Sequence, residues 1–472
     1  MKRIVWMLLL FSAFSFSVMA EPNKLYFSET DANALIHMDQ STVAVIELWS
    51  NPSTGYSWRA KQPLGQTVRI LGSEYESSSS GMLGARTKEL IYVVGNIRGK
   101  SALVLEYRRA QSKAAADTIK YNFDVTGKFN ETFSISSQDA ATNAQDAATA
   151  HRESQTQSAK DLGLPVAFSW CDQNGCTPVR DQGNCGSCWA FATAGPLESL
   201  IKINDGISED LSEQYLVSCN GEGWGCDGGF WAHDYHEWKT ASGESEAGAV
   251  LENDFPYKAS DVNCNPPHDK AYQISSWDYV CGSDSCTPSD AEIKQAIYEH
   301  GPVSVAVCVN DAFQNYSGGV FTGPSCSSLN HGVVLVGWDD NDECWIMRNS
   351  WGSSWGESGY MRIGYGVSGI GSEAAYVSYE DAPTPDPDPD PDPDPDPDPD
   401  PDPAPEGQCI KANNHDHITQ GRANYCGFFG WQACAVGSGD NLGWAISNDS
   451  QVTSIQETSP DYWEKVDSCP NN

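Results

Sequence analysis

Residues 182–191 of the chain read QGNCGSCWAF. From Trp189 to Ile201 the apolar residues recur at the spacing of an α-helix, which places Cys188 at or near the N-terminus of that helix. The helix dipole favours a thiolate at this end and so lowers the pKa of a cysteine there. The stretch therefore predicts a nucleophilic cysteine, and a disulfide role for Cys188 is the plainer alternative.

A cysteine nucleophile needs a base, and the chain has nine histidines. His331 lies at the entry to an apolar run typical of a buried strand, 143 residues after Cys188. Asn349 follows 18 residues later, where its amide can orient an imidazole, and Trp351 can shield that hydrogen bond from water. Gln182 offers a side-chain donor for an oxyanion, beside the Cys188 backbone N–H. Each residue alone has a structural explanation, but the four polar residues in this order predict one catalytic site.

The segment 163–380 resembles the papain family of cysteine peptidases. Besides the stretch around Cys188, the resemblance rests on LP at 164–165, GCDGG at 225–229, GPVSV at 301–305 and NSWG at 349–352. It implies an α+β fold in which a helical lobe and a β-barrel-like lobe meet at a cleft. It also implies hydrolysis of proteins or peptides by a thiolate–imidazolium pair, Cys188 and His331, with no cofactor and no metal.

The same resemblance implies a set of substrate-binding residues along the cleft: Gly228, Gly229, Phe230, Trp231, Asn330 and Trp351. The two glycines would hold substrate backbone. Phe230 and Trp231 would border the pocket for the second residue before the scissile bond. Trp231 stands where many relatives have proline, which predicts a narrower or more aromatic pocket.

The 16 cysteines predict disulfides rather than zinc, because no two Cys-x2-Cys pairs have matching spacing. The papain resemblance implies the bridges Cys185–Cys226 and Cys219–Cys264. Short separations favour Cys171–Cys176 and Cys281–Cys286. The third bridge of the family lacks its second cysteine, so we expect Cys308–Cys326 in its place and Cys344 as a buried free thiol.

Residues 22–134 contain no cysteine and alternate apolar and polar residues in short runs, which predicts an all-β domain. Residues 51–58 read NPSTGYSW and are similar to the first inhibitory loop of the chagasin family, β-sandwich inhibitors of papain-like peptidases. The contact residues would be Asn51, Pro52, Thr54 and Gly55. The resemblance implies an immunoglobulin-like sandwich that contacts the catalytic cleft of its own chain; an ordinary turn between strands is the alternative.

The other two inhibitory loops of that family are only loosely matched. A Gly-rich second loop corresponds to residues 81–85, and the third keeps Arg109 but has lost its aromatic residue. We therefore expect weakened inhibition, or a role in chaperoning and delivery.

The remaining segments differ in composition. Residues 1–20 have the basic start, apolar run and small-residue end of an export signal, so we expect a secreted protein. Residues 135–162 are predicted to be a linker, and 381–406, with its Pro-Asp repeat, a semi-rigid one. Residues 407–472 resemble a small module of bacterial secreted hydrolases, with Cys409–Cys469 and Cys426–Cys434 as expected bridges.

The charge balance limits the partners. Asp and Glu outnumber Lys and Arg by 64 to 28, a formal net charge of −36, which argues against nucleic acid and against an anionic membrane. No later run is apolar enough to span a bilayer, and a monomer is expected. The rival interpretation is a catalytically silent papain-fold protein that binds or adheres to a surface. The presence of all four polar residues of the predicted site argues against it.

Overall fold

The computed structural model describes residues 23–126 apart from 40, 41, 63, 64, 66 and 79, residues 163–380 apart from 327, and six strands with residue 417 between 409 and 466. The expected export signal (1–20) and the linkers (135–162 and 381–406) lie outside these residues. The chain divides into two units, Met1–Asp381 and Ala382–Asn472. Among the helices of the described residues, none is long and apolar enough to cross a bilayer.

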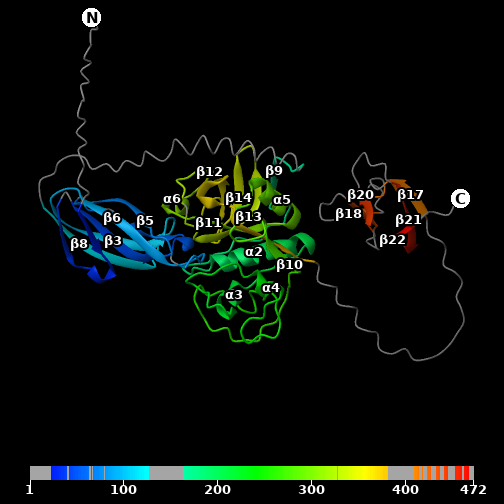
Figure 1. The fold of residues 1–472 in the computed structure, drawn as a ribbon, viewed down its shortest axis with the longest axis horizontal. Helices are drawn as coiled ribbons and strands as arrows, with labels where there is room; N and C mark the ends of the chain where they lie inside the picture. The colour runs from blue at the N-terminus through cyan, green and yellow to red at the C-terminus, as the bar shows by residue number, and fades with distance from the viewer. Residues whose placement is uncertain are drawn as a thin grey trace, which may run out of the picture. The chain divides into compact units, whose positions relative to one another are not determined.

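The N-terminal region is all-β, as its alternating pattern predicts (Figure 1). One sheet has the strand order β1-β3-β6-β5 and the other the order β2-β8-β7-β4. The strands are β1 (Asn23–Phe27), β2 (Leu35–Met38), β3 (Thr42–Ser50), β4 (Tyr56–Ala60), β5 (Val68–Tyr75), β6 (Thr87–Gly95), β7 (Gly99–Arg109) and β8 (Asp117–Val125). A short 3-10 helix, η2 (Pro52–Thr54), lies between β3 and β4.

One apolar core joins the two sheets. In β8 the inward residues Tyr121, Phe123 and Val125 are fully buried, whereas the residues between them are partly exposed. Successive side chains of a strand point to opposite faces, so this alternation turns every second residue into the core. The loops that connect these strands are thereby held on a rigid support.

The central region contains one eight-stranded sheet with the order β10-β16-β11-β13-β14-β15-β12, and β9 pairs with β13 beside that path. Its strands are β9 (Ala167–Ser169), β10 (Ser276–Tyr279), β11 (Val303–Val307), β12 (Val320–Phe321), β13 (His331–Asp339), β14 (Cys344–Arg348), β15 (Tyr360–Gly364) and β16 (Ser372–Ser378). All but the last residue of β13 are buried, as expected for the apolar run that follows His331.

Helix α2 (Cys188–Asn204) joins the two halves of the central region. It packs against β13 and β11 on the side of the sheet and against α3 (Glu213–Cys219) on the other side (Figure 1). Every residue of α2 from Cys188 to Ile201 is buried, because the helix has neighbours on all of its faces. The other helices are α4 (His233–Glu237), α5 (Asp290–His300) and α6 (Asp311–Gln314).

Five disulfides cross-link the central region, and they are the five pairs that the sequence analysis expects there: Cys171–Cys176, Cys185–Cys226, Cys219–Cys264, Cys281–Cys286 and Cys308–Cys326. Cys188 and Cys344 are buried free thiols. The bridge Cys185–Cys226 ties the segment before α2 to the loop that carries Gly228 and Gly229.

The C-terminal unit is described only by its strands and one further residue. β17 (Cys409–Asn413), β21 (Val452–Ser459) and β22 (Tyr462–Val466) form one sheet. β18 (Ala423–Cys426), β19 (Gln432–Ala435) and β20 (Asn441–Trp444) form another. The side chains of Cys409, Cys426, Cys434 and Cys469 lie outside the described part of the chain, so their two bridges stay predictions.

Candidate active site

Cys188 is the first residue of α2, the position that the apolar periodicity predicts. The segment before it is fixed by the Cys185–Cys226 disulfide and by a hydrogen bond of 2.9 Å from the Gly186 N–H to the Cys226 carbonyl. The backbone N–H of Gly332, the second residue of β13, lies within hydrogen-bonding reach of the Cys188 sulfur. The thiol therefore faces the start of the strand that carries His331.

His331 is the first residue of β13, and its ring is held by Asn349, the residue after β14. Nε2 of His331 lies 2.8 Å from Oδ1 of Asn349. An amide oxygen can only accept, so this bond places the proton of a neutral imidazole on Nε2 and leaves Nδ1 as the basic nitrogen. The indole of Trp351 stacks on the imidazole, with ring centroids 5.0 Å apart, and both side chains are fully buried.

Gln182 is buried between the segment before α2 and the chain after β14. Its Nε2 donates to the Cys185 carbonyl at 2.9 Å, and its Oε1 accepts from the Ser350 hydroxyl at 2.7 Å. Ser350 follows Asn349 directly, so one short stretch positions both predicted polar partners of the site. Cys188, His331, Asn349 and Gln182 are thus brought together in one buried place.

The loop around η2 of the N-terminal region covers this site. The Trp351 Nε1–H donates to the Ser53 carbonyl at 2.6 Å, and Ser53 is fully buried. Gly55 has a φ of +74°, and a Cβ there would lie 3.0 Å from the Trp351 indole. Glycine is required here both by the left-handed backbone and by the close approach of the ring. The predicted contact residues Asn51, Pro52 and Thr54 are likewise buried.

A second loop lies along the other wall of the site. Leu83 and Gly229 exchange two backbone hydrogen bonds of 3.0 Å each, and the Gly84 N–H donates to the Asn330 carbonyl at 3.0 Å. Leu83 is fully buried in the same apolar cluster as Cys188 and Trp231. The loop of residues 81–85, whose sequence matches the chagasin family only loosely, therefore makes backbone hydrogen bonds to the peptidase region.

Arg109, at the end of β7, supplies the third contact. Its guanidinium forms an ion pair with Asp181, with N–O distances of 2.8 and 3.0 Å, and donates to the carbonyls of Trp351 at 2.9 Å and Gly183 at 3.1 Å. Its Nε also donates to the Thr54 carbonyl at 2.9 Å. Arg109 keeps these contacts although the aromatic residue that follows it in the family is lost. This loop therefore makes more contacts than its sequence predicts.

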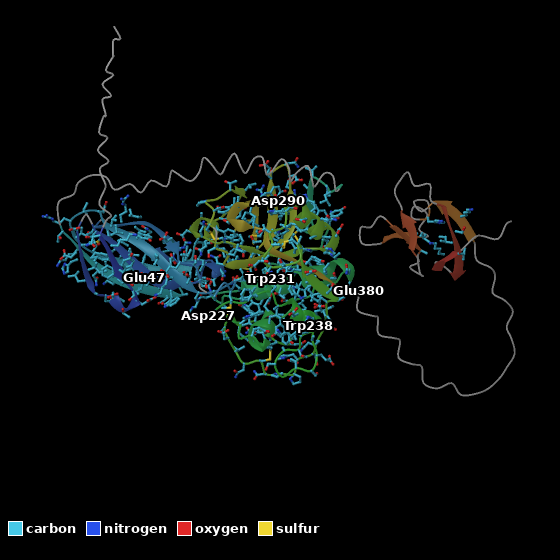
Figure 2. The ribbon with its side chains drawn as sticks, in the orientation of Figure 1. Glu47, Asp227, Trp231, Trp238, Asp290 and Glu380 are labelled. Carbon is cyan, nitrogen blue, oxygen red and sulfur yellow. A yellow bond between two sulfur atoms is a disulfide. The ribbon has the colours of Figure 1, made fainter. Side chains whose placement is uncertain are left out.

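The remaining predicted binding residues take different positions. Phe230 is exposed and lies against Trp224, with ring centroids 5.8 Å apart. Trp231, labelled in Figure 2, is buried, and its Nε1 donates to the Glu373 carbonyl at 2.9 Å. Its ring lies 3.1 Å from where a Cβ of Gly332 would be, so it forms an inner wall rather than a rim. Asn330 turns its side chain toward Val309 and only its carbonyl toward the loop.

Burial determines the charge state of the pair. It raises the pKa of the Cys188 thiol to about 11. It lowers the pKa of His331 to about 4, aided by the charge of Arg109 and opposed by the bond to Asn349. Removal from water disfavours both charged forms. Burial of the covered site therefore opposes the thiolate that the helix dipole favours at this position.

Two polar side chains at the site were not anticipated from the sequence. The Gln314 amide, at the end of α6, donates to the carbonyls of Pro52 and Tyr56. Asp181, in the segment before α2, forms the ion pair with Arg109. Neither belongs to a motif, and only the packing of two distant segments gives them a role. Among the described residues, one group has metal-ligand spacing, Cys219, Cys264 and His268, but its two sulfurs form a disulfide.

Comparison with known proteins assigns families to two segments. The family described as "Papain family cysteine protease" matches residues 164–378, and the "Chagasin family peptidase inhibitor I42" matches residues 38–125. Cysteine endopeptidase RepA of Oryza sativa subsp. japonica is 38% identical over 225 residues, which are 45% of this chain and 57% of that protein. Viral cathepsin of Heliothis zea nuclear polyhedrosis virus is 37% identical over 218 residues, 45% of this chain and 56% of the relative.

The chain thus spans little more than half the length of these curated relatives. Among solved structures, the bromelain protease from Ananas comosus in complex with the E64 inhibitor is 33% identical. It aligns with 46% of this chain and 100% of its own, at a TM-score of 0.40.

Proposed function

We propose that this chain, which carries a papain-family cysteine peptidase domain at residues 164–378 and a chagasin-family domain at residues 38–125, is a cysteine endopeptidase held inactive by its own N-terminal domain. The single observation that carries the proposal is the burial of Cys188 and His331 beneath loops of that domain.

In the proposed mechanism the uncovered site works as a thiolate–imidazolium pair. Cys188 attacks the carbonyl carbon of the scissile bond, and His331 gives its proton to the leaving amine. Asn349 orients the imidazole through the 2.8 Å bond to Nε2, which leaves Nδ1 for proton transfer. The Gln182 side chain and the Cys188 backbone N–H stabilise the oxyanion. Water then hydrolyses the thioester.

Inhibition by the N-terminal domain would act in two ways. The loops of residues 51–55 and 81–85 lie where substrate backbone would bind, along Gly229, Asn330 and Trp351. They also exclude water, which favours the neutral form of both members of the pair. When the domain leaves, water returns, and the helix dipole then favours the thiolate.

We extend the proposal to the rest of the chain. Protein substrates follow from the papain-family domain, and the disulfides support a secreted enzyme, with residues 1–20 as its export signal. We propose that this enzyme is a monomer. We infer that the two N-terminal sheets are an immunoglobulin-like sandwich and that the central domain is two-lobed around α2. Residues 407–472 would be an accessory module of the kind attached to bacterial secreted hydrolases.

The test uses the full chain with a foreign protease site inserted between residues 127 and 162. An irreversible epoxysuccinyl inhibitor is added before and after that site is cut, and labelling of Cys188 is followed by mass spectrometry. A Cys188→Ala chain is the control, and a fluorogenic peptide reports turnover. We expect labelling and turnover to appear after cutting and dilution.

Other results would change the proposal. Equal labelling before and after cutting keeps the peptidase and removes the inhibitory role of the N-terminal domain. No labelling in either state favours the catalytically silent binding protein instead.

A further inference from the structure

The loop of residues 81–85 meets the peptidase as an extended peptide would. Leu83 pairs with Gly229 through two hydrogen bonds, and the next N–H, that of Gly84, donates to the Asn330 carbonyl. Such pairing along an exposed backbone is how peptides are commonly held in extended form. A Cβ on Gly228 would lie 2.9 Å from the Ala85 nitrogen, so the loop lies directly on the wall of the site.

This register brings a peptide bond of the loop to the nucleophile. The Cβ position of Gly84 lies 3.3 Å from the Cys188 sulfur. The peptide bond on the carboxyl side of Gly84 joins the Gly84 carbonyl carbon to the Ala85 nitrogen, and it is the bond that Cys188 would attack. The loop belongs to the same chain as Cys188, so it is held at the site continuously. If this bond were oriented for attack by the sulfur, it would be cleaved.

The Gly84 carbonyl is bound by a donor that is not one of the predicted oxyanion donors. Its oxygen accepts from Nδ2 of Asn51 at 2.7 Å, and a Cβ on Gly186 would lie only 2.0 Å from it. Gln182, the predicted side-chain donor, gives one of its two Nε2–H groups to the Cys185 carbonyl, which leaves the other for an oxyanion. Gly84 has a φ of +83°, and this left-handed backbone lets its N–H follow the extended pattern while its carbonyl departs from it.

Asn51 is fixed in the orientation that this contact needs. Its Oδ1 accepts from the Ser53 N–H at 3.2 Å and from the Ser53 hydroxyl at 2.7 Å, so the amide must present its NH2 group to Gly84. The Asn51 backbone N–H donates to the Tyr107 hydroxyl at 2.9 Å. Asn51 is itself 6% exposed, so water competes little for these bonds.

We propose that the Asn51 amide protects the Gly84–Ala85 bond from the peptidase of its own chain, by holding the Gly84 carbonyl away from the oxyanion donors. The inference rests on the proposed function, since it needs an active Cys188. Asn51 acts here as a positioning residue: it binds the loop in a form that is recognised but not cut.

Without the amide, the carbonyl is free to rotate toward Gln182 and cleavage becomes possible. The Cys188 sulfur would bond to the Gly84 carbonyl carbon, and the carbon–nitrogen bond would break as His331 gives a proton to the Ala85 amine. Water would then hydrolyse the thioester, which leaves a carboxylate at Gly84 and the free thiol at Cys188. The products are two fragments, the second beginning at Ala85.

The test compares full-length chains with Asn51→Asp and Asn51→Ala. Asn51→Asp keeps the oxygen that Ser53 binds but replaces the donor to Gly84 with an acceptor that is negatively charged when ionised, whereas Asn51→Ala removes the donor without adding a charge. The matched control is Asn122→Asp, because the Asn122 amide also donates to a backbone carbonyl, that of Asn33 at 2.8 Å, within the same domain. Each chain is also made with Cys188→Ala, and mass spectrometry follows the fragment that begins at Ala85.

We expect both Asn51 variants to be cut between Gly84 and Ala85 at least tenfold faster than the wild-type and Asn122→Asp chains, and only with Cys188 intact. Equal cleavage of wild type overturns the inference. The inference is also overturned if an Asn51 variant stays uncut, keeps its thermal transition and is rapidly labelled by the epoxysuccinyl inhibitor. Asn51 would then only hold the N-terminal domain on the peptidase. If no chain is labelled even after its inserted linker site is cut, the peptidase itself is absent, and the proposed function fails together with this inference.

Discussion

The indole Nε1–H of Trp351 donates to the Ser53 carbonyl at 2.6 Å, while the same indole stacks on His331. One side chain therefore shields the histidine of the peptidase and holds the loop that covers it. The N–H of the ring binds the N-terminal domain, and the face of the ring stacks on the imidazole. Docking of the N-terminal domain and the proposed catalysis would thus depend on different atoms of one residue.

Trp351→Phe should separate these two roles. Phenylalanine keeps an aromatic face for His331 but leaves the buried Ser53 carbonyl without this donor, at a cost of about 1–3 kcal/mol. We expect epoxysuccinyl labelling of Cys188 in the full-length chain to rise roughly 5- to 150-fold. Trp338→Phe is the matched control, because its Nε1–H donates to the Pro165 carbonyl within the peptidase domain. An equal rise in both variants would point to general destabilisation.

Arg109→Ala should release the N-terminal domain more strongly. The guanidinium is 13% exposed and contacts Asp181, Trp351 and Gly183, and bonds to charged groups contribute about 1.5–3 kcal/mol each. Asp181 is half exposed, which reduces its share. We expect at least a tenfold increase in turnover of a fluorogenic peptide. Arg108→Ala is the control, since that guanidinium bonds to carbonyls of its own loop. Unchanged turnover in Arg109→Ala would contradict the assigned docking role.

Arg109 also shows the limit of sequence reasoning for this chain. The helix that begins at Cys188 and the strand that begins at His331 follow from local apolar periodicity, so both could be predicted. The strength of the Arg109 contact could not, because its partners Asp181 and Trp351 come from another domain. Asp181 belongs to no motif, and the NSWG motif that contains Trp351 gives no sign of a contact with Arg109. The effect of burial on the pKa of Cys188 could not be predicted for the same reason: this burial comes from a loop more than a hundred residues away.

The covered thiol should lack thiolate absorbance at neutral pH. Burial raises the pKa of Cys188 to about 11, so the wild-type chain should gain its thiolate signal only as the pH rises toward that value. The measurement is the ultraviolet difference between a chain with Cys188 and one with Cys188→Ala, both with Cys344→Ala to remove the other free thiol of the described residues. A thiolate signal already present at pH 7 would show that the ion pair exists beneath the loops.

Glu89 should make the stability of the chain depend on pH. Burial raises the pKa of this carboxyl from 4.5 to about 8, aided by the charge of Asp311, although the Trp58 N–H donates to it. Between these two values the unfolded chain ionises while the native one keeps its proton. The free energy of unfolding therefore falls by up to about 1.4 kcal/mol per pH unit as the pH rises from 4.5 to 8.

Glu89→Gln should remove that dependence. We expect its melting temperature, measured in a Cys188→Ala chain, to exceed that of the parent by a margin that grows from pH 5 to pH 8. Glu47→Gln, at the residue labelled in Figure 2, is the control on β3 of the same domain. A margin that is constant with pH would mean that Glu89 is already ionised in the native chain.

The burial of Cys188 has a further consequence, for chemical survival. Peroxides attack the thiolate and not the protonated thiol, and they must reach the sulfur first. A compartment that oxidises five pairs of cysteines would also threaten an exposed nucleophile of the same protein. Beneath its covering loops Cys188 is inaccessible and its thiol has a raised pKa. We therefore expect the covered chain to resist sulfinic acid formation under peroxide and the uncovered chain to lose its thiol. The N-terminal domain would then determine how long the Cys188 thiol survives oxidation, as well as when the enzyme is active.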